Sequence, residues 1–290
     1  MADLHGVSLA MQTPFKDDGS IDYDRFCDLI DRYIDAGVHG VVISSGSGQH
    51  PYLTEEECNK LLSVGVERIA GRASVIMQTS ALNMSEVLRR SIAAEGLGAD
   101  AIMVLPPFFE GPVTDDGIFK FYEEVNKVVG IDIVGYNIPA ATQVEITPEL
   151  YRRLLELENF NYIKDSSGDM IKTQMLINEG GKVLNGADPI APYAFMAGAY
   201  GAIWGSANFM PEECVELYNL VNKGQYNEAL ALWAKMFPSS TYLWYNNYIP
   251  AVKAAARYMG FDAGTVRTPL AEISEESVKQ LIKSLEPLKS

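Results

Sequence analysis

Short runs of apolar and β-branched residues alternate with helix-like patterns along most of the chain. Eight runs have the length and composition of strands: Gly6 to Met11, Gly40 to Ser44, Ser74 to Gln78, Ala101 to Leu105, Asp132 to Tyr136, Tyr162 to Lys164, Lys182 to Leu184 and Gly201 to Trp204. Strands separated by helices predict βαβ units and a parallel sheet. Eight such units in 290 residues favour a (β/α)8 TIM barrel, of class α/β, over an open doubly wound sheet, which usually has fewer strands.

Helix boundaries between these runs support the alternation. Thr54 and Asn83 are each followed three residues later by a glutamate, which is an N-terminal capping pattern, and Thr147-Pro148 places proline at the first helical position. Glycine often ends a helix before the next strand. Glycines stand at such places at Gly37, Gly71, Gly98 and Gly180-Gly181.

After Pro211 the strand-like runs cease and the pattern becomes helical. Apolar spacings of three and four predict helices over Tyr226 to Phe237, Tyr248 to Met259 and Ser274 to Leu285. We therefore expect a barrel over residues 1–223 and a C-terminal helical extension over 224–290. No linker rich in proline or serine separates the two parts, so the extension is expected to pack on the barrel.

Lys164 stands at the end of the sixth strand-like run, where apolar residues give way to the turn residues Ser166 to Asp169. Active sites of such barrels lie at the carboxyl ends of the strands. Burial lowers the pKa of a lysine, and a neutral amine can form a Schiff base with a ketone. Tyr136 ends the fifth run, where its phenol can transfer protons. The alternative is a lysine that reaches solvent and a tyrosine packed in the core.

Polar loops follow three other strands at the same predicted rim. Ser44-Ser-Gly-Ser-Gly-Gln49 carries amides and hydroxyls that can bind a carboxylate or stabilise an oxyanion, although glycine and serine mark ordinary turns far more often. It lacks the Gly-x-Gly-x-x-Gly spacing of dinucleotide sites. Asn185-Gly-Ala-Asp188 and Trp204-Gly-Ser-Ala-Asn208 follow the seventh and eighth runs, and each is equally consistent with a tight βα turn.

Charge and side-chain content exclude several functions. A formal net charge of −15 disfavours nucleic acid or an anionic membrane as a partner. The three histidines show no metal-ligand spacing, so we expect no metal or other cofactor. Only His50, directly after the small-residue loop, is placed to face a pocket, and a lone loop histidine is more often a packing residue. The three cysteines form no Cys-x-x-Cys pair and no targeting segment is visible, so we expect a cytoplasmic protein with free thiols.

Four motifs taken together resemble those of the dihydrodipicolinate synthase/N-acetylneuraminate lyase family. They are Tyr136-Asn-Ile-Pro139, Lys164-Asp-Ser-Ser-Gly-Asp169, Ser45-Gly-Ser-Gly-Gln49 and Asn185-Gly-Ala-Asp188. Their order and rough spacing resemble the family's over essentially the whole chain. The resemblance implies a (β/α)8 barrel with a C-terminal helical extension, usually a homotetramer. It also implies a class I aldolase that works through a lysine Schiff base with pyruvate or another 2-oxo acid.

The resemblance also implies roles for single residues. Lys164 matches the Schiff-base lysine and Tyr136 the proton-relay tyrosine. The small-residue loop resembles the family's Gly-(Thr/Ser)-Thr-Gly-Glu segment, which binds the carboxylate of the 2-oxo acid. The substrate-binding residues expected from these matches are Ser47, Gly46, Gly48, Gly186, Asp188 and Ser206.

Departures from the family narrow the expected substrate. Gln49 replaces the final glutamate of the loop segment. Ala140-Ala141-Thr142 stands where the synthase branch has an arginine for a second carboxylate, and Pro107-Phe108-Phe109 replaces its Pro-Tyr-Tyr motif, which contributes a tyrosine to a neighbouring subunit. Asp188-Pro189 keeps half of the Asp-Glu pair that binds the polyol tail in sialic acid lyases. What remains resembles members that act on 2-keto-3-deoxy sugar acids or 4-hydroxy-2-oxoglutarate.

The expected reaction is the reversible aldol cleavage of a 4-hydroxy-2-oxo acid to pyruvate and an aldehyde. Lys164 attacks the ketone, and Tyr136 takes the proton from the 4-hydroxyl. A 4-hydroxy-tetrahydrodipicolinate (dihydrodipicolinate) synthase and a 2-keto-3-deoxy sugar acid dehydratase remain alternatives. A barrel that binds a 2-oxo acid without catalysis is the alternative of another class.

Overall fold

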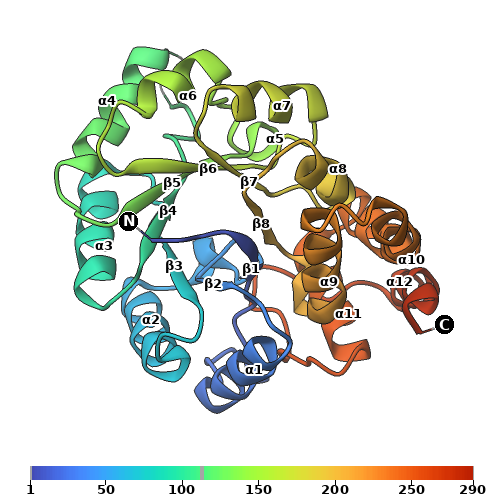
Figure 1. Ribbon diagram of the computed structural model, residues 1–290. Helices are drawn as coiled ribbons and strands as arrows, with labels where there is room; N and C mark the ends of the chain where they lie inside the picture. The colour runs from blue at the N-terminus through green and yellow to red at the C-terminus, as the bar shows by residue number, and fades with distance from the viewer. Residues whose placement is uncertain (1, 112–113, 290) are drawn as a thin grey trace.

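The computed structural model describes residues 2–111 and 114–289. Its strands pair in parallel and in sequence order, and β8 pairs with β1, which closes the barrel (Figure 1). The fold and all of the predicted strand positions are confirmed, with ends that differ by at most two residues. The strands are β1 (Gly6–Ala10), β2 (Gly40–Ile43), β3 (Ser74–Gln78), β4 (Ala101–Val104), β5 (Asp132–Asn137), β6 (Phe160–Asp165), β7 (Lys182–Asn185) and β8 (Gly201–Trp204).

Helices connect the strands and cover the outside of the barrel (Figure 1). Thr54 forms a capping box with Glu57, and Thr147 caps the helix that begins at Pro148, as predicted. The helices are α1 (Tyr23–Asp35), α2 (Glu55–Ile69), α3 (Met84–Gly96), α4 (Asp115–Asn126), α5 (Pro139–Thr142), α6 (Pro148–Leu154), α7 (Met170–Asn178), α8 (Ala191–Met196) and α9 (Pro211–Asn222), with short 3-10 turns η1 (His50–Tyr52), η2 (Asp188–Ile190), η3 (Ser206–Asn208) and η4 (Glu286–Lys289).

Side chains of each strand alternate between two hydrophobic layers, because successive residues of a strand point to opposite faces. In β1, Ala10 belongs to the layer inside the barrel, while Leu9 and Met11 pack in the layer between strands and helices. In β3, Ile76 lies inside and Met77 outside. Within each strand, every second residue therefore belongs to the inner layer, up to the carboxyl end of the strand.

The first residues of the chain close the amino end of the barrel. Figure 1 shows the N-terminal segment running across this opening towards β1. The Ala2 amide donates to the Asp132 carboxylate, and the Tyr162 hydroxyl donates to the Ala2 carbonyl at 2.6 Å. Leu4 packs into the inner layer and is 1% exposed. These hydrogen bonds and the buried Leu4 side chain therefore close the amino end of the barrel.

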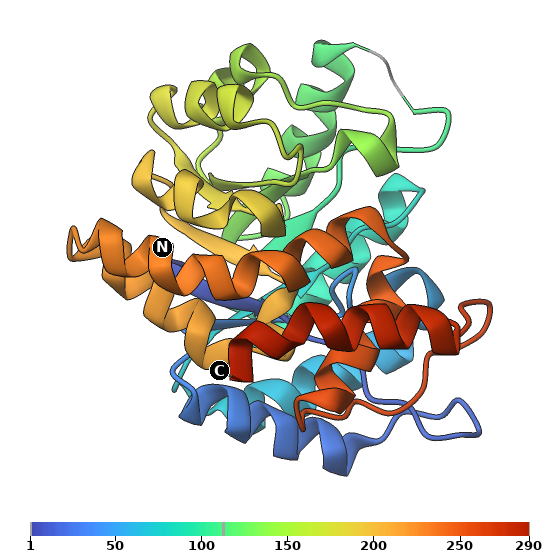
Figure 2. The same cartoon turned by 90° about the vertical axis from the view of Figure 1, so that its right-hand side faces the viewer.

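The extension consists of α10 (Tyr226–Tyr245), α11 (Tyr248–Tyr258) and α12 (Glu275–Leu285), and it packs along one side of the barrel (Figure 2). The prediction that the first of these helices ends at Phe237 is wrong, because α10 continues through Pro238. Proline costs one backbone hydrogen bond, but the turns beyond it bury Ser239, Ser240 and Leu243, and this packing keeps the helix continuous. The boundary between residues 223 and 224 stays a prediction.

Candidate active site

Lys164 and Tyr136 lie side by side at the carboxyl end of the barrel. The neighbouring strands β5 and β6 pair so that these two residues are in register. The Lys164 Nζ lies 4.1 Å from the centre of the Tyr136 ring, an arrangement in which the ring face attracts the cation. Both side chains are buried. The structure therefore brings the predicted lysine and tyrosine together inside the barrel.

Gly186 gives the Lys164 side chain its room. A Cβ built at Gly186 would lie 2.7 Å from the Lys164 Cε and 3.0 Å from its Cγ. Any larger residue there would push the lysine aside, so glycine is required for packing at the end of β7. The predicted substrate-binding residue Gly186 thus lies against the predicted nucleophile.

Asp188 and Ser206 are joined by hydrogen bonds between the ends of β7 and β8. The Asp188 carboxylate accepts from the Ser206 amide at 3.0 Å and from the Ser206 hydroxyl. Its second oxygen accepts from the Tyr248 hydroxyl at 2.7 Å. Burial raises the pKa of Asp188, against the opposing effects of these hydrogen bonds and of the Lys164 charge. The carboxylate is therefore a buried anchor for this side of the site, and the sequence analysis did not find Tyr248 from α11.

The small-residue loop after β2 is fixed to the end of β1. The Ser45 hydroxyl donates to the Met11 carbonyl at 3.1 Å and accepts from the Gly48 amide at 3.2 Å, and the Thr13 hydroxyl donates to the Gly48 carbonyl at 2.8 Å. A Cβ at Gly48 would lie only 2.8 Å from the Met11 carbonyl oxygen. Gly48 is therefore required for the close approach of the two loops.

The tip of this loop keeps its donors unused. Among the described residues, the amides of Gly46 and Ser47 and the Ser47 hydroxyl donate to no acceptor. A Cβ at Gly46 would meet nothing within 4 Å. Adjacent free amides and a hydroxyl form a group of donors suited to an anion such as a carboxylate.

Gln49 links this loop to the C-terminal extension. Its side-chain amide is fully buried and donates to the Arg267 carbonyl at 3.1 Å, while its oxygen accepts from the Arg267 amide at 3.1 Å. A glutamate could accept the second bond but could not donate the first. The Arg267 guanidinium binds the Glu57 carboxylate and the Gly19 carbonyl. The loop that follows β2 is thus held from both sides, and sequence reasoning missed Arg267.

His50 is a packing residue. The Ser80 carbonyl lies 2.7 Å from its Nε2 and can only accept, so Nε2 carries the hydrogen and Nδ1 accepts from the Ser44 hydroxyl at 2.8 Å. Burial lowers the pKa of His50 to about 4. A neutral ring with both nitrogens bonded is not available as a catalytic base.

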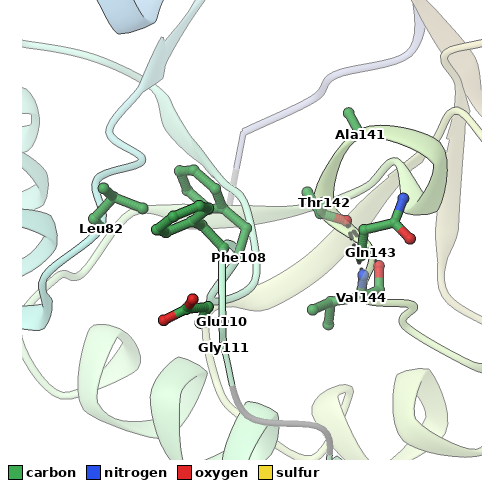
Figure 3. Close-up of a pocket in the computed structure, with 9 residues that line it drawn as sticks. Leu82, Phe108, Glu110, Gly111, Ala141, Thr142, Gln143 and Val144 are labelled. Carbon is green, nitrogen blue, oxygen red and sulfur yellow. Dashed lines mark hydrogen bonds between the residues drawn. The ribbon is translucent and has the colours of Figure 1, made fainter.

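A cavity of about 670 Å³ opens at the same rim, over the ends of β3, β4 and β5 (Figure 3). It lies between Leu82, Phe108 and Glu110 on one side and Ala141 to Val144 on the other. None of the described residues that line it is a lysine or an arginine. Phe109 also lines it and is 75% exposed. Phe108 and Phe109, and Ala141 and Thr142, belong to the two stretches at which this sequence departs from the synthase branch, and these four residues line the cavity.

Residues 2–111 and 114–289 show neither a metal-binding cluster nor a membrane-spanning helix. They contain no cluster of three or more His, Cys, Asp or Glu side chains arranged to bind a metal ion. None of the helices in these ranges has the length and hydropathy needed to cross a bilayer.

Comparison with known proteins places the chain in a family. The model of the dihydrodipicolinate synthetase family matches residues 3–288. The 4-hydroxy-tetrahydrodipicolinate synthases of Methanocaldococcus jannaschii and Kosmotoga olearia are 32% and 29% identical to the chain, and each alignment covers 98% of both proteins. The crystal structure of the dihydrodipicolinate synthase from Acinetobacter baumannii, described as complexed with pyruvate, superposes with a TM-score of 0.95 at 27% identity and covers 99% of both chains.

Proposed function

The chain belongs to the dihydrodipicolinate synthetase family and is a carbon–carbon lyase of the class I aldolase type. We propose that it reversibly cleaves a 4-hydroxy-2-oxo acid to pyruvate and an aldehyde. The contact between Lys164 and Tyr136 carries the proposal, because it joins a buried amine and a phenol at the active end of the barrel. Pyruvate bound to the Acinetobacter baumannii structure supports a 2-oxo acid as the ligand.

Lys164 is the nucleophile of the proposed reaction. Its Nζ adds to the ketone carbon, and loss of water gives a protonated imine. Tyr136 relays the proton of the 4-hydroxyl, which is later delivered to C3, and the bond between C3 and C4 breaks with its electron pair passing to the imine. The aldehyde leaves, the resulting enamine is protonated at C3, and water releases pyruvate and the free lysine. Gly186 leaves the space in which Lys164 can bend towards the ketone.

The loop residues Gly46, Ser47 and Gly48 hold the carboxylate of the 2-oxo acid in this proposal. The support for Gly46 and Ser47 is the group of unused donors at the loop tip, while the Gly48 amide already donates to the Ser45 hydroxyl and Gly48 supports the site through the close approach of the loops. Asp188 and Ser206 form the opposite wall, where their mutual hydrogen bonds fix the end of β8. Substrate held in this way places the ketone near Lys164 and saves the entropy of bringing the two together.

The cavity at the rim favours an aldehyde without a negative charge at its far end. Within the part of the chain that the structure describes, no cationic side chain lines it, and Glu110 lies in its wall. This supports a 2-keto-3-deoxy sugar acid more than 4-hydroxy-2-oxoglutarate, whose second carboxylate would need a donor such as a guanidinium.

A second candidate is the 4-hydroxy-tetrahydrodipicolinate synthase reaction, which the names of the relatives favour. Against it stand Ala140 and Ala141, which offer no guanidinium, and Phe109, which cannot transfer protons. A dehydratase shares the imine and expels a hydroxyl instead.

We also propose a homotetramer in the cytoplasm. Apolar side chains on two parts of the surface are exposed, namely Leu82 and Phe109 at the rim and Ile171 on α7, with exposed fractions of 66%, 75% and 76%. Subunit contacts would bury such residues. Free cysteines throughout the described chain support a reducing compartment.

The deciding experiment is reduction with borohydride in the presence of pyruvate, followed by intact-mass and peptide-mass spectrometry. We expect a reduced pyruvate adduct on Lys164 in the wild type and none in Lys164→Ala. Lys172→Ala, a surface lysine paired with Glu145 on the neighbouring segment, serves as the control and should keep the adduct. A folded wild type without adduct would contradict the proposal and favour a barrel that binds without catalysis. If the adduct forms, cleavage of 2-keto-3-deoxy sugar acids and formation of 4-hydroxy-tetrahydrodipicolinate separate the candidate reactions.

A further inference from the structure

Gln12 and Gln78 stand at the carboxyl ends of two strands on the inside of the barrel. Gln12 follows Ala10 of the inner layer by two positions, and Gln78 follows Ile76 of that layer by two. The residues just before them, Met11 and Met77, pack in the outer layer. Since side chains alternate along a strand, both glutamines point into the barrel at the end that holds Lys164.

The amide groups of both glutamines are buried without partners. Gln12 is 1% exposed, and neither its amide nitrogen nor its oxygen has a hydrogen bond within the described chain. Gln78 is 3% exposed, and its amide oxygen is likewise unpaired among these residues. Buried amides are nearly always hydrogen-bonded, because leaving them unpaired costs free energy. A partner from outside the chain is therefore expected here.

Both glutamines lie beside the loop that offers its donors to a carboxylate. β1 and β3 are the two strands that pair with β2, from which this loop begins. On the β1 side, the backbone N–H of Gln12 donates to the side-chain oxygen of Asn208 at 3.1 Å. Asn208 belongs to the same turn as Ser206. Gln12 thus lies between the loop and the turn after β8, and Gln78 lies on the other side of the loop.

The loop itself offers few side-chain donors. The Ser45 hydroxyl already donates to the Met11 carbonyl, and Gly46 has no side chain. Ser47 therefore carries the only free hydroxyl among these three residues. Two primary amides on the flanking strands can supply the missing donors, and their oxygens can accept from a hydroxyl or a water molecule.

We propose that Gln12 and Gln78 are substrate-binding residues whose amides hydrogen-bond the carboxylate and ketone end of the 2-oxo acid from both sides of the loop. The inference rests on the proposed function and names two further residues of that site. Neutral amides bind a carboxylate without the charge of a lysine or arginine, so they place no second cation beside Lys164 and the imine that it forms. The ligand class is a small 2-oxo acid with its carboxylate at C1.

The test measures the concentration of pyruvate that gives half-maximal borohydride trapping on Lys164. In Gln12→Leu and in Gln78→Leu we expect this concentration to rise roughly 10-fold or more, because each variant loses a hydrogen bond to a charged group. The extent of trapping at saturating pyruvate should stay near that of the wild type. Gln225→Leu, the same change at an exposed position before α10, is the matched control and should leave the value unchanged.

A rescue variant separates binding from a merely structural role. Gly46→Ser adds a hydroxyl at a position where a Cβ meets nothing within 4 Å and where φ is not left-handed. Combined with Gln12→Leu, it should recover part of the lost affinity for pyruvate. Unchanged half-maximal concentrations in both leucine variants, each folded by circular dichroism, would overturn the inference and assign the amides to internal water. Absence of trapping in the wild type would instead contradict the proposed function.

Discussion

Two buried lysines occupy different regions of the molecule and have opposite surroundings. Lys253 lies where α11 meets the loop after β1, is fully buried, and donates to the carbonyls of Thr13 and Ala263 at 2.9 Å each. Lys164 lies inside the barrel, where no described residue accepts a hydrogen bond from its Nζ, which lies over the face of the Tyr136 ring. Burial alone therefore does not make a nucleophile. An amine held by two carbonyls fastens one segment to another, whereas an amine without acceptors can turn towards a substrate.

The largest expected effect follows from removing the phenol beside Lys164. In Tyr136→Phe we expect kcat for aldol cleavage to fall by roughly 100- to 10,000-fold, because proton transfer by a positioned side chain contributes about that much. The imine should still form with pyruvate, since Lys164 and Gly186 are unchanged. Steady-state cleavage and borohydride trapping, measured on the same preparation, check this. An equal loss of cleavage and of trapping would show that Tyr136 also takes part in imine formation by Lys164.

A smaller effect is expected from filling the space beside Lys164. In Gly186→Ala, the added Cβ would lie 2.7 Å from the Lys164 Cε and within contact of the Ser166 hydroxyl, so the lysine must move. We expect trapping of pyruvate to slow by about 10- to 100-fold, because misplacement of a reacting group by about 1 Å can cost that much. The measurement is the rate of adduct formation by mass spectrometry. Gly224→Ala, in the turn before α10, has open space at its Cβ but a left-handed φ, and it controls for a general loss of stability.

The lysine outside the barrel should affect stability through pH. Burial lowers the pKa of Lys253 to about 7 from its usual 10.5. Between these values the unfolded chain binds a proton that the folded chain does not, so the free energy of unfolding should rise with pH, by up to about 1.4 kcal/mol per pH unit. Below pH 7 both states are protonated and this contribution becomes constant.

Denaturant unfolding between pH 7 and 9 checks the expected slope. Other groups titrate in this range, so the informative quantity is the difference in slope between the wild type and Lys253→Met. We expect the variant to show the shallower rise and to keep its pyruvate adduct on Lys164. Parallel slopes would contradict a neutral Lys253 in the folded protein.

The smallest effect is expected at the contact between the barrel loop and the extension. In Gln49→Glu the Arg267 carbonyl loses its donor and faces a carboxylate oxygen, which should shift the loop that presents Ser47. We expect KM for the 2-oxo acid to rise about fivefold with little change in kcat, in line with one weakened neutral hydrogen bond. Gln49→Met, which removes both bonds without adding charge, should behave similarly, and a change in kcat alone would speak against a positioning role.

The sequence predicts the barrel and the position of Lys164 next to Tyr136 well, and it does so for a physical reason. Strands of a parallel barrel are buried on both faces, so they appear as apolar runs between helices, and their carboxyl ends mark the rim. Lys164 and Tyr136 end two such neighbouring runs. Lys253 and Arg267 carry no such signal, because their partners Thr13 and Gln49 are more than 200 positions away in the chain. Only the packed structure shows these pairs, or that the amides of Gln12 and Gln78 are left without partners.

The seal formed by Ala2, Asp132 and Tyr162 has a kinetic consequence. A barrel that is closed at its amino end has a single opening for its reactants. The fragment that is bound deeper can therefore leave only after the other fragment has left. In the proposed cleavage we expect the aldehyde to lie nearer the opening and to depart first, and pyruvate, still joined to Lys164, to depart last. Pyruvate should then be a competitive inhibitor against the 4-hydroxy-2-oxo acid, whereas added aldehyde should inhibit noncompetitively. Product-inhibition kinetics distinguish the two patterns.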